Sequence, residues 1–274
     1  MKFTEMKQQF FIALVFLSQS CKAQELYSMT EPASNMASGS IGFRLDNSMM
    51  NEINSPTINY HLVPEIMVGL SRKLMIHGNA FFSNREKKFA AEGGSLYAKY
   101  RFLSLDAVQR HFRMAAFGRI SSNNSDIHQE EINMYGHNSG FEAGIVATQL
   151  LRKVALSSGF SYLRAIDNGK NNKFLYGSKS SKAVNFTFSF GKLMLPKEYR
   201  DYRQTNINLM VEFLSQLNVG SGKYYMDIAP SVQMIFNSQS RIDIGYRKEM
   251  SSTLLRTAPN GFFVRLEHNF FNVF

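Results

Sequence analysis

The sequence has one cysteine, Cys21, and no tryptophan among its 274 residues. A single thiol excludes an internal disulfide and any metal site that needs two thiolate ligands. Apart from a short run near the start, no stretch approaches the roughly 18 consecutive apolar residues that a membrane-spanning helix needs. A Gly-rich phosphate loop, a paired zinc motif and a nucleophile elbow are also missing. These absences argue against a helical membrane protein and against the commonest nucleotide-binding and hydrolase classes.

The first residues have the pattern of a secretory signal peptide. Lys2 and Lys7 precede an apolar run at 10–17, and polar and small residues follow it. A run of about eight residues is too short to anchor the chain in a bilayer, so we predict cleavage after Ala23. The alternative is cleavage before Cys21 with lipidation of its thiol. We expect a signal peptide at 1–23, a flexible periplasmic segment at 24–38 and one domain at 39–274.

The charge balance is basic, with 31 Lys and Arg against 21 Asp and Glu, a net charge of +10. In a cytosolic chain this balance would indicate nucleic acid as a partner, but an exported chain seldom meets it. We therefore expect no nucleic acid. The expected counter-charges are anionic lipid head groups, including the phosphates of lipopolysaccharide.

From residue 39 onward, apolar and polar residues alternate with a period of two. In 184–190, Val and Phe alternate with Asn, Thr and Ser, and 206–213 repeats the pattern with Ile, Leu, Val and Phe. Alternation of this kind gives an extended segment one apolar and one polar face. It predicts about twelve strands, an even number as bacterial single-chain barrels require. They lie near 39–48, 57–70, 74–83, 94–103, 111–121, 139–151, 154–165, 182–193, 204–215, 223–236, 241–249 and 261–274.

The connections between these segments alternate in length. Those on one side include 71–73, 105–110, 152–153 and 238–240, with 196–203 as the long exception. Those on the other side are mostly longer and polar: 49–56, 84–93, 122–138, 167–181, 216–222 and 250–260. Transmembrane barrels have short periplasmic turns and longer extracellular loops. The lengths therefore predict that both termini lie in the periplasm.

The last segment, 261–274, ends on an aromatic residue with alternating apolar residues behind it. Phe270 and the terminal Phe274 resemble the C-terminal insertion signal of outer-membrane β-barrel proteins, which the barrel assembly machinery reads. The resemblance covers the mature chain as an architecture, and it carries over no catalytic or binding residue. It implies an all-β, transmembrane antiparallel up-and-down β-barrel in the cell outer membrane. The chain departs from the class in having only Phe and Tyr for its interfacial girdle.

If the apolar faces contact lipid, the polar faces line the lumen, and they are rich in charge. Opposed charges could pair and seal a narrow interior, or they could form the selective lining of a narrow pore. Bases gather on the fourth and fifth strands and acids on the ninth to eleventh, so a transverse field is expected. The candidate lumen-lining residues are Arg44, Asp46, Glu65, Lys99, Arg101, Arg113, Arg119, Glu142, Glu212, Asp227, Asp243, Arg247, Arg265 and Glu267.

The hairpin of the second and third strands carries His61, Met67, Met75 and His77 on its inward face. A turn centred on Arg72 places Met67 opposite His77. Imidazole and thioether together favour copper over hard cations, so these four residues are a candidate metal site. The alternative is that they only pack or form hydrogen bonds. No other cofactor is expected.

Enzymatic activity is not expected. A serine lipase in a barrel wall needs a Ser, a His and an orienting polar residue at the lipid-facing surface. His61 and Ser83 would lie opposite one another, but the period of two points both inward. His268 points outward and has no serine near it on its strand.

The sequence therefore predicts a narrow channel, or a barrel that binds or transports a small solute or metal ion. The alternatives are a closed barrel with a structural or partner-binding role, an outer-membrane lipid-modifying enzyme and a soluble periplasmic β-sandwich. Segment 24–38 is polar and has no clear period. Besides a flexible leader, it could be a plug in the lumen or a contact for a periplasmic partner.

Overall fold

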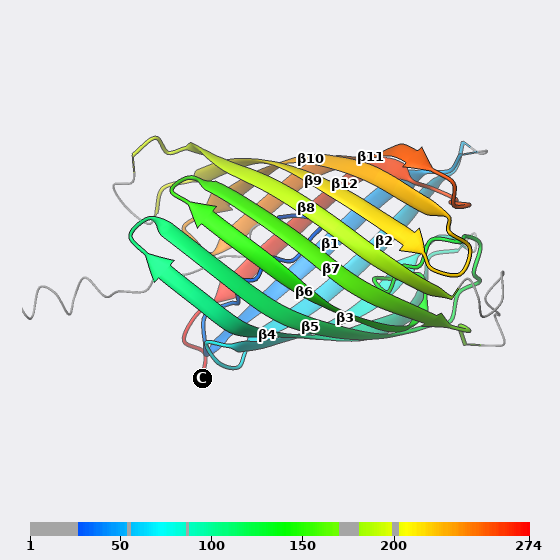
Figure 1. Ribbon diagram of the computed structural model, residues 1–274, viewed down its shortest axis with the longest axis horizontal. Coiled ribbons are helices and arrows are strands. Elements are labelled where there is room, and N and C mark those ends of the chain that lie inside the picture. Colours follow the sequence, from blue (N-terminus) through cyan, green and yellow to red (C-terminus); the bar gives the residue numbers. More distant parts are fainter. Residues whose placement is uncertain (1–26, 54–55, 86–87, 170–180, 199–202) are drawn as a thin grey trace, which may run out of the picture.

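The computed structural model describes residues 27–53, 56–85, 88–169, 181–198 and 203–274. The predicted signal peptide with Cys21, residues 24–26, most of the connection 167–181 and the centre of 196–203 lie outside these ranges. The described residues contain no helix, and hence none that is long and apolar enough to cross a membrane. They form twelve strands (Figure 1): β1 Ser40–Asn51, β2 Ile58–Gly69, β3 Leu74–Ser83, β4 Ala90–Ala107, β5 Arg110–Asn123, β6 Ser139–Leu151, β7 Val154–Ile166, β8 Lys182–Leu195, β9 Asn206–Asn218, β10 Tyr224–Phe236, β11 Ser240–Ser252 and β12 Asn260–Phe270.

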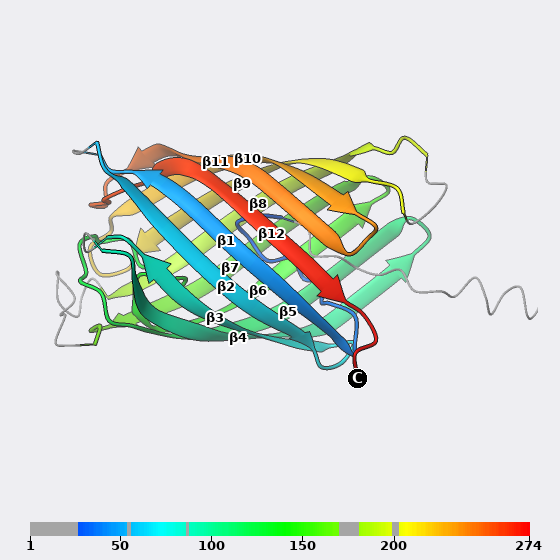
Figure 2. The ribbon, with the colours of Figure 1, turned by 180° about the vertical axis from the view of Figure 1, so that it is seen from behind.

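The twelve strands make one closed antiparallel barrel in which each strand pairs with its neighbours in the sequence. The ring closes between β1 and β12, which lie side by side in Figure 2, and their register runs from Ile41 opposite Phe270 to Asn51 opposite Asn260. Closure leaves no sheet edge whose backbone groups lack a partner, a condition that a barrel in lipid has to meet. The predicted fold class is confirmed.

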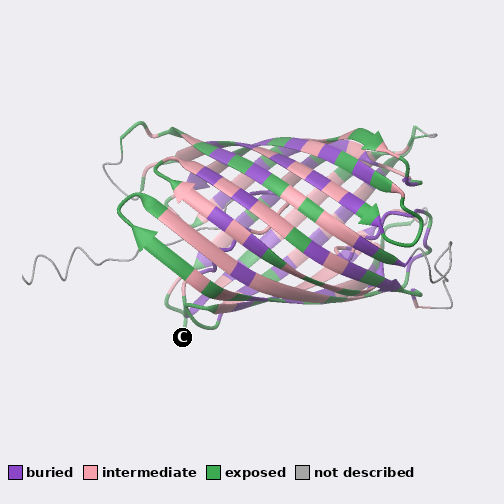
Figure 3. Ribbon diagram, in the orientation of Figure 1, coloured by how far each residue is buried: buried purple, intermediate pink, exposed green. Residues whose placement is uncertain are grey.

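Burial alternates along the strands (Figure 3). The exposed residues are largely apolar and the buried ones largely polar, which is the opposite of a soluble protein. On β10, Met226 and Val232 are 43% and 38% exposed, whereas Asp227 and Gln233 are 0% exposed. The same inversion places Phe186, Phe188 and Phe190 of β8 on the outer surface. An apolar exterior around a polar interior is stable only where the surroundings are themselves apolar. The outer wall is therefore built to contact acyl chains.

The predicted strand bounds are correct for β3 and β6, and they differ most for β4, followed by β9 and β12. β4 begins at Ala90 because Ala90 and Ala91 pair with Ser83 and Phe82 at the end of β3, beyond a register shift. β12 ends at Phe270, not at residue 274, because Asn272 adopts a left-handed backbone at φ +57°. Phe274 lies beyond the last strand, so only Phe270 of the predicted insertion signal belongs to it.

Short connections gather at one end of the barrel, where the C-terminus also lies (Figure 1). Residues 70–73, 108–109, 152–153 and 237–239 join β2 to β3, β4 to β5, β6 to β7 and β10 to β11. Gln109, Arg152, Asn237 and Ser238 have positive φ angles of 50° to 56°, as tight hairpins require. The opposite end carries most of the long connections, including 124–138 between β5 and β6.

Candidate functional site

Two segments of the chain lie inside the barrel. Residues 27–39, here called the plug, precede β1, and Figure 2 shows them as a dark blue trace that crosses the interior. Residues 124–138, here called the inward loop, enter from the end with the long connections. Tyr27 and Ala33 of the plug are 1% and 0% exposed, and Ile132 and Met134 of the inward loop are 1% and 2% exposed. Parts of this chain therefore occupy the interior.

The plug differs from the flexible leader that the sequence favours, and it matches the alternative of a lumen plug. Its strongest anchor is Glu212 on β9, which is 0% exposed. The Glu212 carboxylate accepts hydrogen bonds from the backbone N–H groups of Ser28, Met29 and Thr30 at 2.8, 2.9 and 2.8 Å. Hydrogen bonds to a charged acceptor are about twice as strong as neutral ones. Residues 28–30 lack the regular repeat of a strand or helix, so their orphan N–H groups need such an acceptor.

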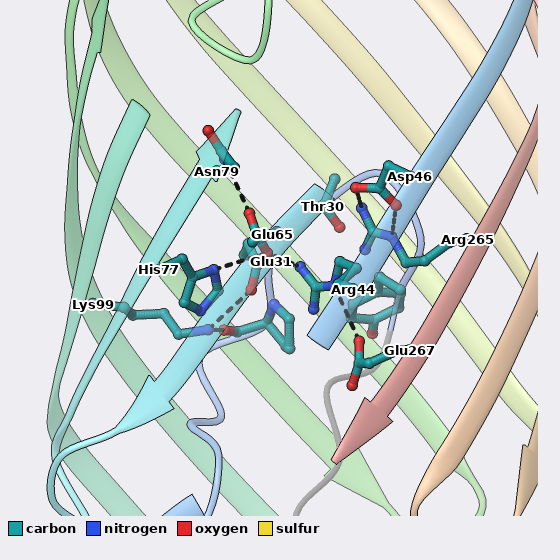
Figure 4. A network of polar contacts seen from close by, with 12 residues as sticks. Thr30, Glu31, Arg44, Asp46, Glu65, His77, Asn79, Lys99, Arg265 and Glu267 are labelled. Carbon is teal, nitrogen blue, oxygen red and sulfur yellow. Dashed lines mark hydrogen bonds and ion pairs between the residues drawn. The ribbon is translucent and has the colours of Figure 1, made fainter. Parts of the chain in front are cut away.

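Ion pairs hold the middle of the plug to the opposite wall (Figure 4). Glu31 contacts the Arg44 guanidinium on β1 at 3.0 Å and the Lys99 ammonium on β4 at 3.2 Å. Lys99 also donates to the carbonyl of Pro32 at 2.9 Å. Arg44 reaches Glu65 and Glu267 as well, so one guanidinium joins the plug to β2 and β12. Four of the charged residues that were predicted to line the lumen, Arg44, Lys99, Arg113 and Glu212, thus bind the chain's own plug.

The inward loop is held by a cluster of buried ions. Glu131 contacts Arg256, from the connection 253–259, at 2.6 Å and Arg247 of β11 at 3.2 Å. Both guanidinium groups also contact Asp227 of β10. Burial raises the pKa of Glu131, but Arg256 and Arg247 outweigh it and hold that pKa at about 2. Glu131 therefore stays ionised, and the cluster ties the loop to β10 and β11.

The end of the inward loop packs against β1 and β2 through two rings. The Tyr135 hydroxyl donates to Asp46, and burial together with that carboxylate raises the pKa of Tyr135. His137 stacks on His61 with ring centroids 5.0 Å apart and planes 13° apart, and its Nδ1 lies 2.6 Å from the Arg85 guanidinium. Burial and then the Arg85 charge hold the pKa of His137 well below its ordinary value. His137 is therefore a neutral ring among cations.

Among the described residues, cavities of about 230 and 150 Å³ lie beside the plug and the inward loop. Both touch Met29 of the plug and residues 131, 133 and 135 of the inward loop. In the larger one, the Arg119 guanidinium lies 4.9 Å from the ring centres of both Tyr97 and Tyr135. The cavities are thus lined by guanidinium groups, carboxylates and phenol rings, and each is large enough for a few water molecules or a small polar solute.

The predicted lumen-lining residues all occupy inward-facing positions of their strands. Arg101 and Arg113 lie nearest the short turns, where Arg101 donates to the carbonyl of Arg72 and Arg113 donates to Ser34 of the plug. Asp243 pairs with Arg241, and Asp46 pairs with Arg265 at 2.9 Å. Sequence reasoning missed Arg85, Glu131, His137 and Arg256, which lie in loops. The sequence did contain one signal for the inward loop. Ile127, Ile132 and Met134 are large apolar residues, which are unusual in an exposed loop, and the structure buries all three.

The structure corrects the predicted metal set of His61, Met67, Met75 and His77. The register places Met67 opposite His77 and His61 opposite Ser83, as predicted. However, His61 stacks on His137 of the inward loop, whereas Met67 and Met75 pack with Met36 of the plug. His61 therefore does not join the other three. Ser83 donates its hydroxyl proton to Glu92, not to His61, so the two residues do not form a nucleophile and base pair.

No protein-family profile and no curated protein matches this sequence. Among solved structures, the chain is similar to the COG4313 outer membrane channel from Pseudomonas putida F1, with a TM-score of 0.57 and 11% sequence identity over 90% of this chain and 100% of that chain. It also matches OccK11 of Pseudomonas aeruginosa, with a TM-score of 0.40 and 8% identity over 92% of this chain and 74% of that chain. The first of these likenesses shows the fold alone. The chain thus has the fold of a bacterial outer-membrane β-barrel.

Proposed function

We propose that the protein is an outer-membrane channel for small polar solutes that is closed at rest by its plug and inward loop. The observation that carries the proposal is the chemistry of the closure. Two carboxylates, Glu212 and Glu31, make five of the plug's polar contacts with the wall. A permanently sealed barrel gains more from an apolar core, since replacing buried ion pairs by packed apolar groups is often neutral or stabilising. Both the lining and the plug are polar. This supports an interior that water and solutes can enter once the plug has left it.

The proposal also includes the orientation of the barrel in the outer membrane. The short turns and the C-terminus share one end of the barrel. Since short turns of such barrels are periplasmic, both the C-terminus and the plug belong to the periplasmic side. The outward-facing Lys182 and Lys248 lie exposed near the other rim, where lipopolysaccharide phosphates are the expected partners. Phe270 and Phe274 remain the proposed signal for the barrel assembly machinery.

The alternative is a sealed barrel with a structural role, and the occupied interior is the observation that favours it. Both functions require the plug that the structure contains, but they differ in whether it moves. A sealed barrel would use Glu212 and Arg44 only to hold its wall together. The two functions therefore predict different outcomes when the plug is removed.

Swelling of proteoliposomes in neutral sugars and amino acids of increasing size separates the two functions. The protein would be compared with a variant that lacks residues 27–36 and carries Arg256→Met, so that it has no plug and has lost the main ion pair of the inward loop. The variant keeps the contact of Gly39 with Gly69. We expect slow swelling for the complete chain and fast, size-limited swelling for the variant. A variant that migrates as a folded, heat-modifiable barrel and yet does not swell the liposomes would support the sealed barrel and contradict the channel.

A further inference from the structure

Three methionines from different parts of the chain pack together at the end of the barrel with the short turns. Met36 comes from the plug, Met67 from β2 and Met75 from β3, and they are 6%, 0% and 0% exposed. A Cβ atom placed on Gly42 would come within 2.7 Å of the Met67 methyl group and 2.9 Å of the Met36 methyl group. The two thioether ends thus converge over Gly42 of β1.

A buried imidazole belongs to the same face. His77 is the register partner of Met67 and follows Met75 by two residues, so all three side chains share the inward side of the hairpin. Facing side chains of such a pair have Cβ atoms about 5 Å apart, within reach of a flexible methionine. The Nδ1 atom of His77 lies 3.2 Å from a carboxylate oxygen of Glu65, and both ring nitrogens are buried without a hydrogen-bond partner among the described residues.

This arrangement has the features of a metal-binding imidazole. A ligating histidine usually presents its second nitrogen to a carboxylate, which fixes the ring and leaves the other nitrogen for the ion. Glu65 supplies that carboxylate, and it is 3% exposed. A buried imidazole nitrogen without a hydrogen-bond partner destabilises the folded protein unless a ligand binds to that nitrogen.

The charges around His77 select the type of ion. Glu31 and Glu65 each place an oxygen within 4.8 Å of His77, but Arg44 contacts both carboxylates and Lys99 contacts Glu31. A hard divalent cation would have to displace these cations from their carboxylates. Thioether and imidazole groups are neutral and soft, and they favour Cu(I). A monovalent ion also suffers less repulsion from the neighbouring guanidinium and ammonium groups.

We propose that the barrel binds a soft monovalent cation, Cu(I) or its redox-inert analogue Ag(I). The ligands are Met36, Met67, Met75 and His77. Glu65 is a positioning residue that orients the imidazole. This site replaces the predicted set by exchanging His61 for Met36, and it is independent of whether the barrel conducts solutes.

Titration of the folded barrel in detergent with Ag(I), followed through methionine methyl groups labelled with carbon-13, tests the site in the unaltered protein. We expect the methyl resonances of Met36, Met67 and Met75 to shift together and to saturate at equimolar Ag(I). Met210, equally buried beside Tyr27, is the internal control and should not shift. Shifts that are confined to exposed methionines, or no shift at all, would overturn the proposal.

Competition for Cu(I) against bicinchoninate under reducing conditions provides the second test. Met67→Leu and Met75→Leu preserve apolar volume, and Met210→Leu is the matched control. The loss of an outer-shell partner alone weakens metal sites by about tenfold or more, so loss of a thioether should weaken Cu(I) binding at least that much. Equal Cu(I) affinity in the unaltered protein and in the variant that combines Met67→Leu with Met75→Leu would refute the site. If that double variant does not fold, the Ag(I) titration of the unaltered protein decides.

Discussion

At the scale of single residues, the plug depends most on the Glu212 carboxylate. It accepts the N–H groups of three successive residues, and no other described side chain makes as many hydrogen bonds to the plug backbone. Arg241, which is 1% exposed, adds one hydrogen bond to the carbonyl of Tyr27 at 3.1 Å. Removing the charge of Glu212 while keeping its shape should therefore loosen the plug without altering the wall.

We expect Glu212→Gln to raise the open fraction of single channels in planar bilayers. The glutamine amide keeps one acceptor oxygen but has no charge. This should destabilise the closed state by about 2 kcal/mol, which shifts the ratio of open to closed channels about 30-fold. Glu142→Gln is the matched control, because Glu142 is also inward-facing but accepts its hydrogen bond from Ser161 of β7. An unchanged open fraction in folded Glu212→Gln would count against this anchor.

His137 should make the closure sensitive to pH. Its ring faces His61 of β2, Arg85 after β3, and the Arg247 and Arg256 charges from the other wall, and burial among them lowers its pKa from 6.5. A released inward loop would regain the ordinary pKa and take up a proton. The closed position therefore keeps its full stability above about pH 6.5 and loses stability as the pH falls below that value.

The measurement is the open fraction of the channel between pH 7.5 and 5, which lies above the ordinary pKa of 4.5 that Glu131 would regain in a released loop. We expect openings to increase toward pH 5 by at most about tenfold per pH unit for one proton. His137→Gln should flatten this dependence. If the variant retains the full slope, another group controls the pH response.

At the scale of elements, an ion cluster holds the inward loop beside its apolar packing against β7 and β8. Arg256 contacts Glu131, Asp227 and Glu249, and its guanidinium lies 4.1 Å from the ring centre of Tyr225. Removing one partner of a buried ion pair typically costs about 3–5 kcal/mol, because the other charge stays buried. The inward loop should leave the lumen when Arg256 is lost.

Arg256→Met should therefore expose Glu130 and Glu131, which are 2% and 6% exposed in the closed barrel. A glutamate-specific protease should then cut the chain between β5 and β6, and the fragments can be followed on a gel. Arg110→Met, at an exposed turn, is the control and should resist the cut as the unaltered protein does. Resistance of folded Arg256→Met would show that other contacts hold the inward loop.

The elements differ in how far the sequence predicts them. The strands can be predicted because the alternation of apolar and polar residues depends only on neighbours in the sequence. Residues Val184 to Phe190 of β8 show this alternation without interruption. The plug has no period, because residues 27–39 contact the wall through single side chains and backbone groups. The inward loop depends on partners distant in sequence: Glu131 meets Arg256 across 125 positions. Such pairings are fixed by closure of the ring. The sequence therefore predicted the charged wall and offered the plug as an alternative, but it did not predict the inward loop.

At the scale of the whole molecule, the outer wall should be sensitive to charge according to depth. Phe188, near the middle of β8, and Leu217, near the end of β9, are 38% and 47% exposed on the outer face. A lysine costs about 2–4 kcal/mol at the bilayer midplane and about 0–1 kcal/mol near the interface. Phe188→Lys should thus lower the free energy of unfolding in lipid vesicles far more than Leu217→Lys. Equal losses would argue that the Phe-rich wall does not contact acyl chains.

The central claim is that the plug is a movable part that closes a conducting barrel. Ser28 of the plug and Ser231 of β10 have hydroxyl oxygens 3.4 Å apart, close enough for a disulfide after replacement of both by cysteine. The most direct measurement is single-channel conductance of Ser28→Cys/Ser231→Cys in a Glu212→Gln, Cys21→Ser background, before and after reduction. We expect a silent barrel while the disulfide is formed and frequent openings once it is reduced. Conductance that is the same in both states, or absent in both from a folded barrel, would contradict the account.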